Sequence, residues 1–165
     1  ALSALRKKGA AKAAKRAERK ALEGVVEVYG HPGGRVGVML ELNCETDFVG
    51  RNERFVELAH DLALHVAAMH PKYVSKEDIP QERIDQLTDE YREQALDQGK
   101  PDDIVDKIVA GRLEKYFSEV CLLEQGFVKD EEVTVQQLVT NLIGVLGENI
   151  VVRRFVRYEL GEESD

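Results

Sequence analysis

Apolar and polar residues alternate most clearly between residues 35 and 44. A period of two is typical of a β-strand with one buried face. The β-branched run at residues 25–30 predicts another strand, and the Pro- and Gly-rich residues 31–34 predict a turn between the two. We therefore predict an antiparallel hairpin. Its second strand should turn one apolar set toward the core, namely Val36, Val38, Leu40, Leu42 and Cys44, and leave the other face to Gly37, Met39, Glu41 and Asn43.

The period changes to a helical one after residue 52. Asn52 is a candidate N-cap for this helix, and Pro71 should stop it. A second helical pattern begins at Thr134 and ends near Gly147. The apolar stripe of the first helix recurs at Phe55, Leu58, Leu62, Val66 and Met69.

Residues 150–158 alternate again and predict a closing strand. One face of this strand should be basic and point outward. The alternation places Ile150, Val152, Arg154, Val156 and Tyr158 on one side and Val151, Arg153, Phe155 and Arg157 on the other.

A helical hairpin is predicted at about residues 81–118. Gly99 can take the left-handed position after the first helix, and Pro101 suits the first turn of the second. Because the apolar stripes are narrow and many positions are charged, we expect an antiparallel coiled-coil arm that projects from the body. Residues 120–123 fit either a short strand or the end of the second helix. The two stripes are Ile84, Leu87, Tyr91 and Ala95, then Ile104, Ile108, Leu113, Tyr116 and Phe117.

These elements predict an α+β fold, in which a small antiparallel sheet packs with helices and a helical hairpin projects. The chain has 165 residues, enough for one sizeable core, with 43% hydrophobic and 33% charged residues. It contains no apolar run of the roughly 20 residues that a membrane helix needs, so we expect a soluble cytoplasmic protein without a membrane partner. The opening residues resemble neither a signal peptide nor a natural start, and we expect a chain cut from a longer one.

The net charge of −8 is divided unevenly along the chain. Residues 1–23 carry five Lys, three Arg and two Glu, which leaves −14 on residues 24–165. We interpret residues 1–23 as a basic helix and linker and residues 24–165 as the core. The acidic core argues against nucleic acid as a direct ligand, although the basic segment keeps an RNA- or ribosome-associated module open as an alternative.

Evidence for enzyme chemistry is weak. The one candidate set for nucleophilic or metal chemistry combines Cys44, Asp61 and three histidines, His60, His65 and His70. A spacing of five residues turns the histidines onto different faces of a helix, so they do not converge on a metal. Cys44 continues an apolar strand face and is favoured as a packed thiol over a hydrolase nucleophile. We predict no catalytic residue, no metal and no cofactor.

The least ordinary local feature is the segment at residues 46–50, TDFVG, between a strand and a helix. In one interpretation Thr46 or Asp47 caps the next helix and Phe48 is buried. In the other, Phe48 fills a pocket of a partner protein while Asp47 adds negative charge. Gly147 is likewise either a helix C-cap or a place where a partner's backbone comes close. His31 at the hairpin turn should be exposed.

Two runs resemble the elongation factor Ts family: residues 41–49, ELNCETDFV, and residues 147–154, GENIVVRR. The basic opening segment, HVAAMHPKY at residues 65–73 and GKP at residues 99–101 also fit, so the resemblance covers essentially the whole chain. It implies a guanine-nucleotide exchange factor that binds elongation factor Tu and promotes GDP release. It also implies that residues 1–23 are the remnant of an N-terminal helical module.

The same resemblance implies the contact residues and the assembly. Phe48 would enter an apolar pocket of elongation factor Tu with Asp47 beside it, within a loop that includes Thr46 and Val49. Leu146 and Gly147 would lie at the contact, and His31 is a weaker candidate. Since short members of the family pair to supply a second copy of the core, the single copy of each motif here predicts a noncovalent homodimer.

Overall fold

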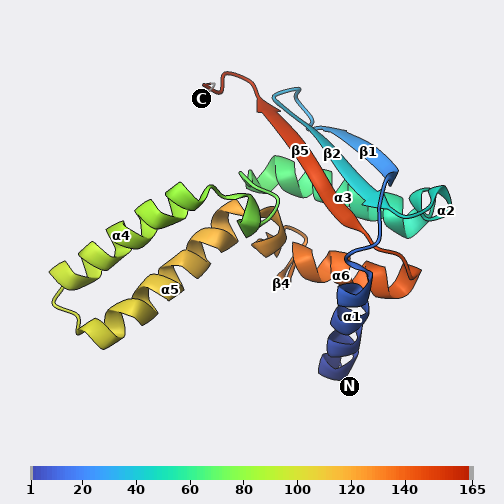
Figure 1. Cartoon of the computed structure of the whole chain (residues 1–165). Coiled ribbons are helices and arrows are strands. Elements are labelled where there is room, and N and C mark those ends of the chain that lie inside the picture. The colour runs from blue at the N-terminus through green and yellow to red at the C-terminus, as the bar shows by residue number, and fades with distance from the viewer. Residues whose placement is uncertain (1, 164–165) are drawn as a thin grey trace. The chain divides into compact units, whose positions relative to one another are not determined.

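The central element is a three-stranded antiparallel sheet, seen in a computed structural model that describes residues 2–163 (Figure 1). Strands β1 (Glu23–Gly30) and β2 (Val36–Cys44) form the predicted hairpin, and β5 (Val151–Glu159) pairs with the other edge of β2. The observed fold is α+β, as the sequence predicts.

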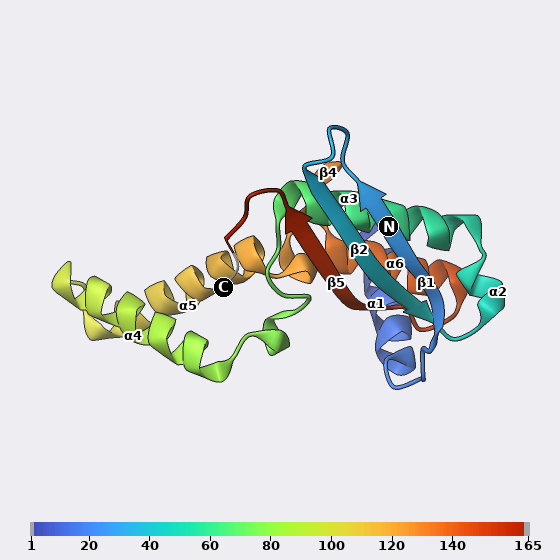
Figure 2. The same ribbon diagram turned by 90° about the horizontal axis from the view of Figure 1, so that it is seen from above.

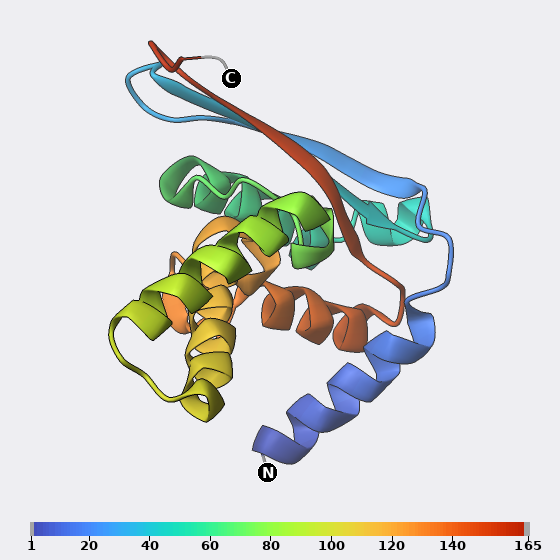
Figure 3. The ribbon, with the colours of Figure 1, turned by 60° about the vertical axis from the view of Figure 1, so that its left-hand side comes forward.

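Helices lie on one side of this sheet (Figures 2 and 3). Helix α3 (Glu53–Met69) packs against β1 and β2, while α6 (Val135–Leu146) packs against α3 and against α1 (Leu2–Arg16). The predicted Asn52 N-cap is confirmed. The helical pattern predicted from Thr134 is observed as α6, and Thr134 itself is the N-cap, forming a capping box with Gln137. The apolar face of β2 and the inner faces of α3 and α6 supply the core: Val38, Leu40, Leu42, Cys44, Phe55, Leu58, Leu62, Val66, Val135, Val139 and Ile143.

Two short elements of this unit are absent from the sequence prediction. Helix α2 (Asp47–Gly50) has four residues, and β3 (Gly126–Phe127) pairs with β4 (Asp130–Thr134) in a small second sheet. Neither is long enough to show a period of its own.

The predicted faces of β5 are wrong beyond Arg153. The register with β2 shifts there, because Glu41 pairs with Arg154 and Leu42 with Val152, which leaves Arg153 as an extra residue. Such a bulge reverses the alternation after it. Val156 therefore lies on the outer face, whereas Arg157 turns toward α3 and donates hydrogen bonds of 3.3 and 3.0 Å to the carbonyl oxygen of Ala67.

Residues Pro71–Gln125 form a compact unit of their own. It contains the predicted helical hairpin, α4 (Gln81–Asp97) and α5 (Asp102–Val120), with short 3₁₀ turns at Lys76–Asp78 and Leu122–Glu124. Gly99 has a φ of 77°, as predicted, but Pro101 precedes α5 as its N-cap.

The predicted apolar stripe of α5 is wrong only at its first residue, since Ile108, Leu113, Tyr116 and Phe117 all pack against buried residues. Val105 and Val109 are buried against Ala95, whereas Ile104 is exposed. The open question at residues 120–123 is also resolved, since α5 ends at Val120 and Cys121 makes a parallel bridge with Tyr73.

No helix among the described residues is long and apolar enough to cross a membrane.

Candidate functional site

The TDFV segment forms a short projecting loop at the end of β2. Thr46 is the N-cap of α2, and its side-chain oxygen accepts a hydrogen bond of 3.3 Å from the backbone N–H of Val49. Val49 and Gly50 are buried, which fixes the base of the loop. Asp47 is exposed, and the Phe48 side chain is 76% exposed. A large aromatic ring thus stands in solvent on an anchored helical turn.

The structure supports part of each interpretation of this loop. Capping by Thr46 is confirmed, but burial of Phe48 is wrong. Adjacent residues of a helix point about 100° apart, so the inward direction of Val49 turns Phe48 outward. Asp47 pairs with Arg51 at 3.6 Å, and since both side chains are well exposed this pair contributes little stability.

The GENI segment lies directly beside this loop. Gly147 has a φ of 76° and is the left-handed C-cap of α6, with its N–H bonded to the carbonyl of Ile143 at 2.9 Å. The next residue, Glu148, accepts hydrogen bonds from the backbone N–H groups of Glu45 and Thr46. The two motifs are therefore joined through Glu148, and Leu146 and Gly147 directly precede this residue in the chain.

His31 lies away from this loop. It follows β1 at the hairpin turn, whereas the loop follows β2 at the opposite end of the paired strands. Seven residues of strand separate those ends, or about 23 Å. His31 is exposed and its Nδ1 lies 3.1 Å from the hydroxyl of Tyr29. Any contact made by His31 would be separate from that of Phe48.

Cys44 supports the loop from beneath and is not set up as a nucleophile. Its buried Sγ–H donates to the carbonyl oxygen of Thr46 at 3.1 Å. Burial is the main reason why its pKa is raised to about 11, and the negative charge of Glu148 adds to the effect. Cys121 is also buried, with its pKa raised to about 11 by the same main cause.

The three histidines of α3 occupy three different environments. His60 lies 3.4 Å from Glu27, and His70 lies 3.5 Å from Glu162. His65 is buried, stacks on Phe127 and accepts a hydrogen bond at Nδ1 from the N–H of Val128. Among the described residues no three His, Cys, Asp or Glu side chains form a group that could hold a metal ion.

We expect both thiols to react slowly with a disulfide reagent at pH 8. With a pKa of about 11 in place of 9.0, the thiolate population is about 100-fold smaller, and burial slows access further. Because the neutral thiols are favoured in the folded protein, their contribution to stability is complete below pH 9 and is lost as the pH rises through 11. Thiol titration with and without denaturant compares the reaction rates of the two thiols in the unfolded and the folded protein. Rapid reaction of Cys44 in the folded chain would contradict it.

Comparison with known proteins shows which family contains these features. The family model described as "Elongation factor TS" matches residues 9–162. Curated proteins named "Elongation factor Ts" from Moorella thermoacetica and Carboxydothermus hydrogenoformans are 57% and 56% identical to the chain. Each alignment covers 98% of this chain, and 80% and 75% of the respective relative. The chain belongs to the elongation factor Ts family.

The match to the elongation factor Ts family includes residues of both compact units. The match includes the Phe48 loop, the turn after α6 and the whole helical hairpin. A relative of the same name from Heliobacterium modesticaldum is 54% identical over 162 residues, with 98% of this chain and 75% of the relative covered. The chain is therefore a member of a translation elongation factor family.

Proposed function

We propose that the chain is a guanine-nucleotide exchange factor that promotes GDP release from elongation factor Tu. The observation that carries this proposal is the exposed ring of Phe48 on a loop whose base is buried and capped. Exposed aromatic side chains on rigid supports are typical energetic centres of protein interfaces. The family resemblance supplies the identity of the partner.

In this proposal Phe48 enters an apolar pocket of elongation factor Tu and Asp47 lies beside it. Together they shift the partner's elements that hold magnesium and the phosphates of GDP. Leu146 and Gly147 contact the same partner, because the turn that contains them adjoins the loop. His31 would make a second, separate contact.

Exchange of this kind requires differential binding and no covalent step. A factor that binds the nucleotide-free partner more tightly than the GDP-bound partner lowers the affinity for GDP by the same factor. The proposal therefore makes the chain a binding protein and not an enzyme. The protonated, buried state of Cys44 agrees with this.

The proposal is tested by following labelled GDP as it leaves elongation factor Tu in the presence of excess unlabelled GDP. The chain should accelerate release in a concentration-dependent way. A rate equal to that without the chain would refute the exchange function.

We also propose that the chain is a homodimer, paired through the face of the sheet opposite α3. Apolar side chains cross this face in register, since Val28 pairs with Met39 and Met39 with Val156. The Val28 and Tyr158 side chains are 65% and 76% exposed. A second copy of this face would bury them, which is the main favourable contribution to association.

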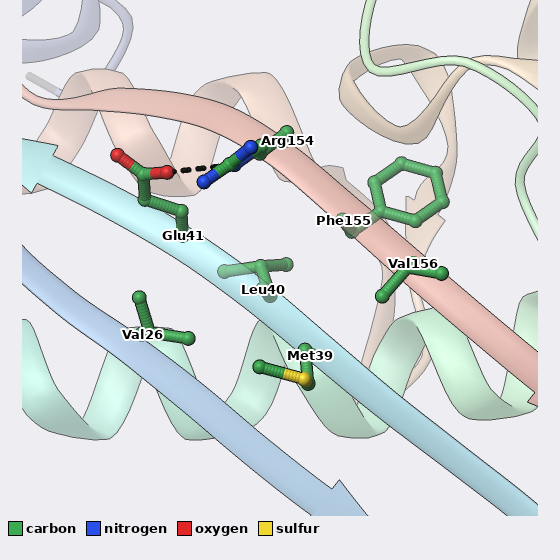
Figure 4. Close-up of a pocket in the computed structure, with 7 residues that line it drawn as sticks. All are labelled: Val26, Met39, Leu40, Glu41, Arg154, Phe155 and Val156. Carbon is green, nitrogen blue, oxygen red and sulfur yellow. Dashed lines mark hydrogen bonds and ion pairs between the residues drawn. The ribbon is translucent and has the colours of Figure 1, made fainter.

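The outer face of the sheet also has a suitable shape and charge for pairing with itself. A hollow of about 260 Å³ opens between the three strands, with Val26, Met39 and Val156 at its wall (Figure 4). The one carboxylate there, Glu41, is already paired with Arg154 at 2.9 Å. Apposing two copies therefore brings no unpaired charge of Glu41 into the interface.

Replacement of Met39 by Asp should convert the dimer to monomer at micromolar concentration. An unpaired carboxylate in an apolar interface costs several kcal/mol, while the same residue on an exposed monomer surface is tolerated. Leu96→Asp on α4 is the matched control, because both native side chains are 47% exposed. Sedimentation measures the mass: a Met39→Asp chain that remains a dimer would exclude this face as the interface.

The remaining assignments follow from the same proposal. Residues 1–23 would be a basic helix and linker, the remnant of an N-terminal helical module, and residues 24–165 would form the core and dimerisation domain. Binding through the acidic core, with −14 on residues 24–165, makes direct binding to nucleic acid unnecessary. Action on elongation factor Tu places the chain in the cytoplasm.

A further inference from the structure

A pair of glutamates connects the Phe48 loop to the turn after α6. The Glu148 carboxylate accepts three hydrogen bonds from the loop: from the N–H of Glu45 at 3.1 Å, the N–H of Thr46 at 3.0 Å and the Thr46 hydroxyl at 2.7 Å. In return, a carboxylate oxygen of Glu45 accepts from the N–H of Asn149 at 2.8 Å. Each motif thus contributes a side chain that binds the backbone of the other, and we call this arrangement the carboxylate clasp.

The carboxylate clasp binds the start of α2, a helix too short to be stable without other contacts. Helix α2 contains four residues, and an isolated helical turn of that length is unstable in water. Its orientation therefore depends on the burial of Val49 and Gly50 at its base and on its cap, Thr46. The Thr46 oxygen that accepts from Val49 also donates to Glu148, so the carboxylate fixes the cap that starts the turn.

The other half of the clasp is held in place by the chain before β1. Asn149 is buried, and its side-chain amide donates to the carbonyl oxygens of Ala17 and Arg19 at 3.4 and 2.9 Å. Arg16 at the end of α1 donates to the carbonyl of Ile143 at 3.2 Å, and Arg19 lies 3.7 Å from Glu45. The turn that carries Glu148 is therefore fixed to α6 and to the linker after α1.

We propose that Glu148 is a positioning residue of the exchange site, which sets the direction of Phe48 through the cap at Thr46. This inference rests on the proposed exchange function and adds a residue to it. Glu148 acts on the partner through Phe48 and makes no required contact of its own. Its charge strengthens the hydrogen bonds to the two N–H groups, and its length lets it reach them.

Three substitutions separate positioning from direct contact with the partner. Glu148→Gln keeps the reach and loses the charge, Glu148→Asp keeps the charge and loses the reach, and Glu148→Ala loses both. We expect Glu148→Ala to reduce acceleration of GDP release by about tenfold, the effect of losing charge-assisted hydrogen bonds. Glu148→Gln should retain more activity than Glu148→Asp. The opposite order would show that activity does not follow the reach of the side chain to the loop, and it would overturn the inference.

A double variant tests whether Glu148 works through Phe48. In a Phe48→Ala background, Glu148→Ala should reduce exchange by less than twofold further, because the ring that it positions is gone. A merely structural role predicts the full tenfold loss again. Multiplicative losses in the double variant would therefore refute positioning.

Hydrogen exchange in the chain alone separates this inference from the proposed function. Glu148→Ala should speed exchange of the Val49 and Gly50 amides at least tenfold, with Phe55 and Leu62 in α3 unchanged. If the wild-type chain fails to accelerate GDP release, the proposed function fails, and the inference that Glu148 holds the loop is decided by these amides. If their protection does not change, the clasp does not position the loop, whatever the exchange rates show.

Discussion

Phe48→Ala is expected to weaken binding to nucleotide-free elongation factor Tu by about 2–4 kcal/mol, or roughly 30- to 1,000-fold. The exposed ring contributes little to the core, so the free energy of unfolding should change by no more than about 0.5 kcal/mol. A large loss of binding free energy with little change in the free energy of unfolding would assign Phe48 a binding role and not a structural one. Titration of the variant against the partner, together with denaturant unfolding of the variant alone, measures both.

Phe48→Leu is the control for this prediction. Leucine keeps an apolar side chain on the same turn and should recover part of the lost affinity, whereas the charge of Asp47 is untouched in both variants. Equal affinity of the wild-type and Phe48→Ala chains would remove Phe48 from the interface while leaving the exchange function itself to be tested.

Gly24→Ala is expected to have the largest effect on stability, about 3 kcal/mol or more. Gly24 has a φ of 135°, and a Cβ atom there would lie 2.0 Å from the carbonyl oxygen of Leu42 and 2.8 Å from the Cα of Asn43. Both are backbone atoms of the paired strand, so relief requires separation of β1 from β2. Strained backbone and overpacking each contribute 1–3 kcal/mol, and the melting temperature should fall by roughly 10 °C.

The matched control is Gly30→Ala at the other end of β1. A Cβ at Gly30 meets nothing within 4 Å, so the same substitution should change stability by less than about 1 kcal/mol. Thermal unfolding of the two variants gives the comparison. Similar melting temperatures would show that the close approach of Gly24 to β2 is not a determinant of stability.

Elements whose apolar pattern extends over many residues could be predicted from the sequence. The alternation of β2 and the stripe of α3 each extend over at least nine residues, and each faces a single core. The prediction was wrong where one residue changes the register. The bulge at Arg153 reverses the faces of β5, and the burial of Val105 exposes Ile104. Tertiary packing decides such shifts, and local propensity does not show them.

The loop illustrates the same limit at the candidate site. The sequence indicates either Thr46 or Asp47 as a cap, but the direction of Phe48 depends on which neighbour enters the core, and in the structure this neighbour is Val49. Glu148 was missed altogether because its hydrogen bonds join residues more than 100 positions apart. A glutamate directly after a C-cap glycine was the only local signal, and it is a weak one.

The central claim is that binding of the chain and binding of GDP to elongation factor Tu oppose each other. Sedimentation of the chain with the partner, without nucleotide and then with saturating GDP, tests this most directly. We predict a stable complex without nucleotide that GDP dissociates, because linkage requires the two ligands to weaken each other equally. A complex of the same stability with and without GDP, or no complex in either case, would contradict the account.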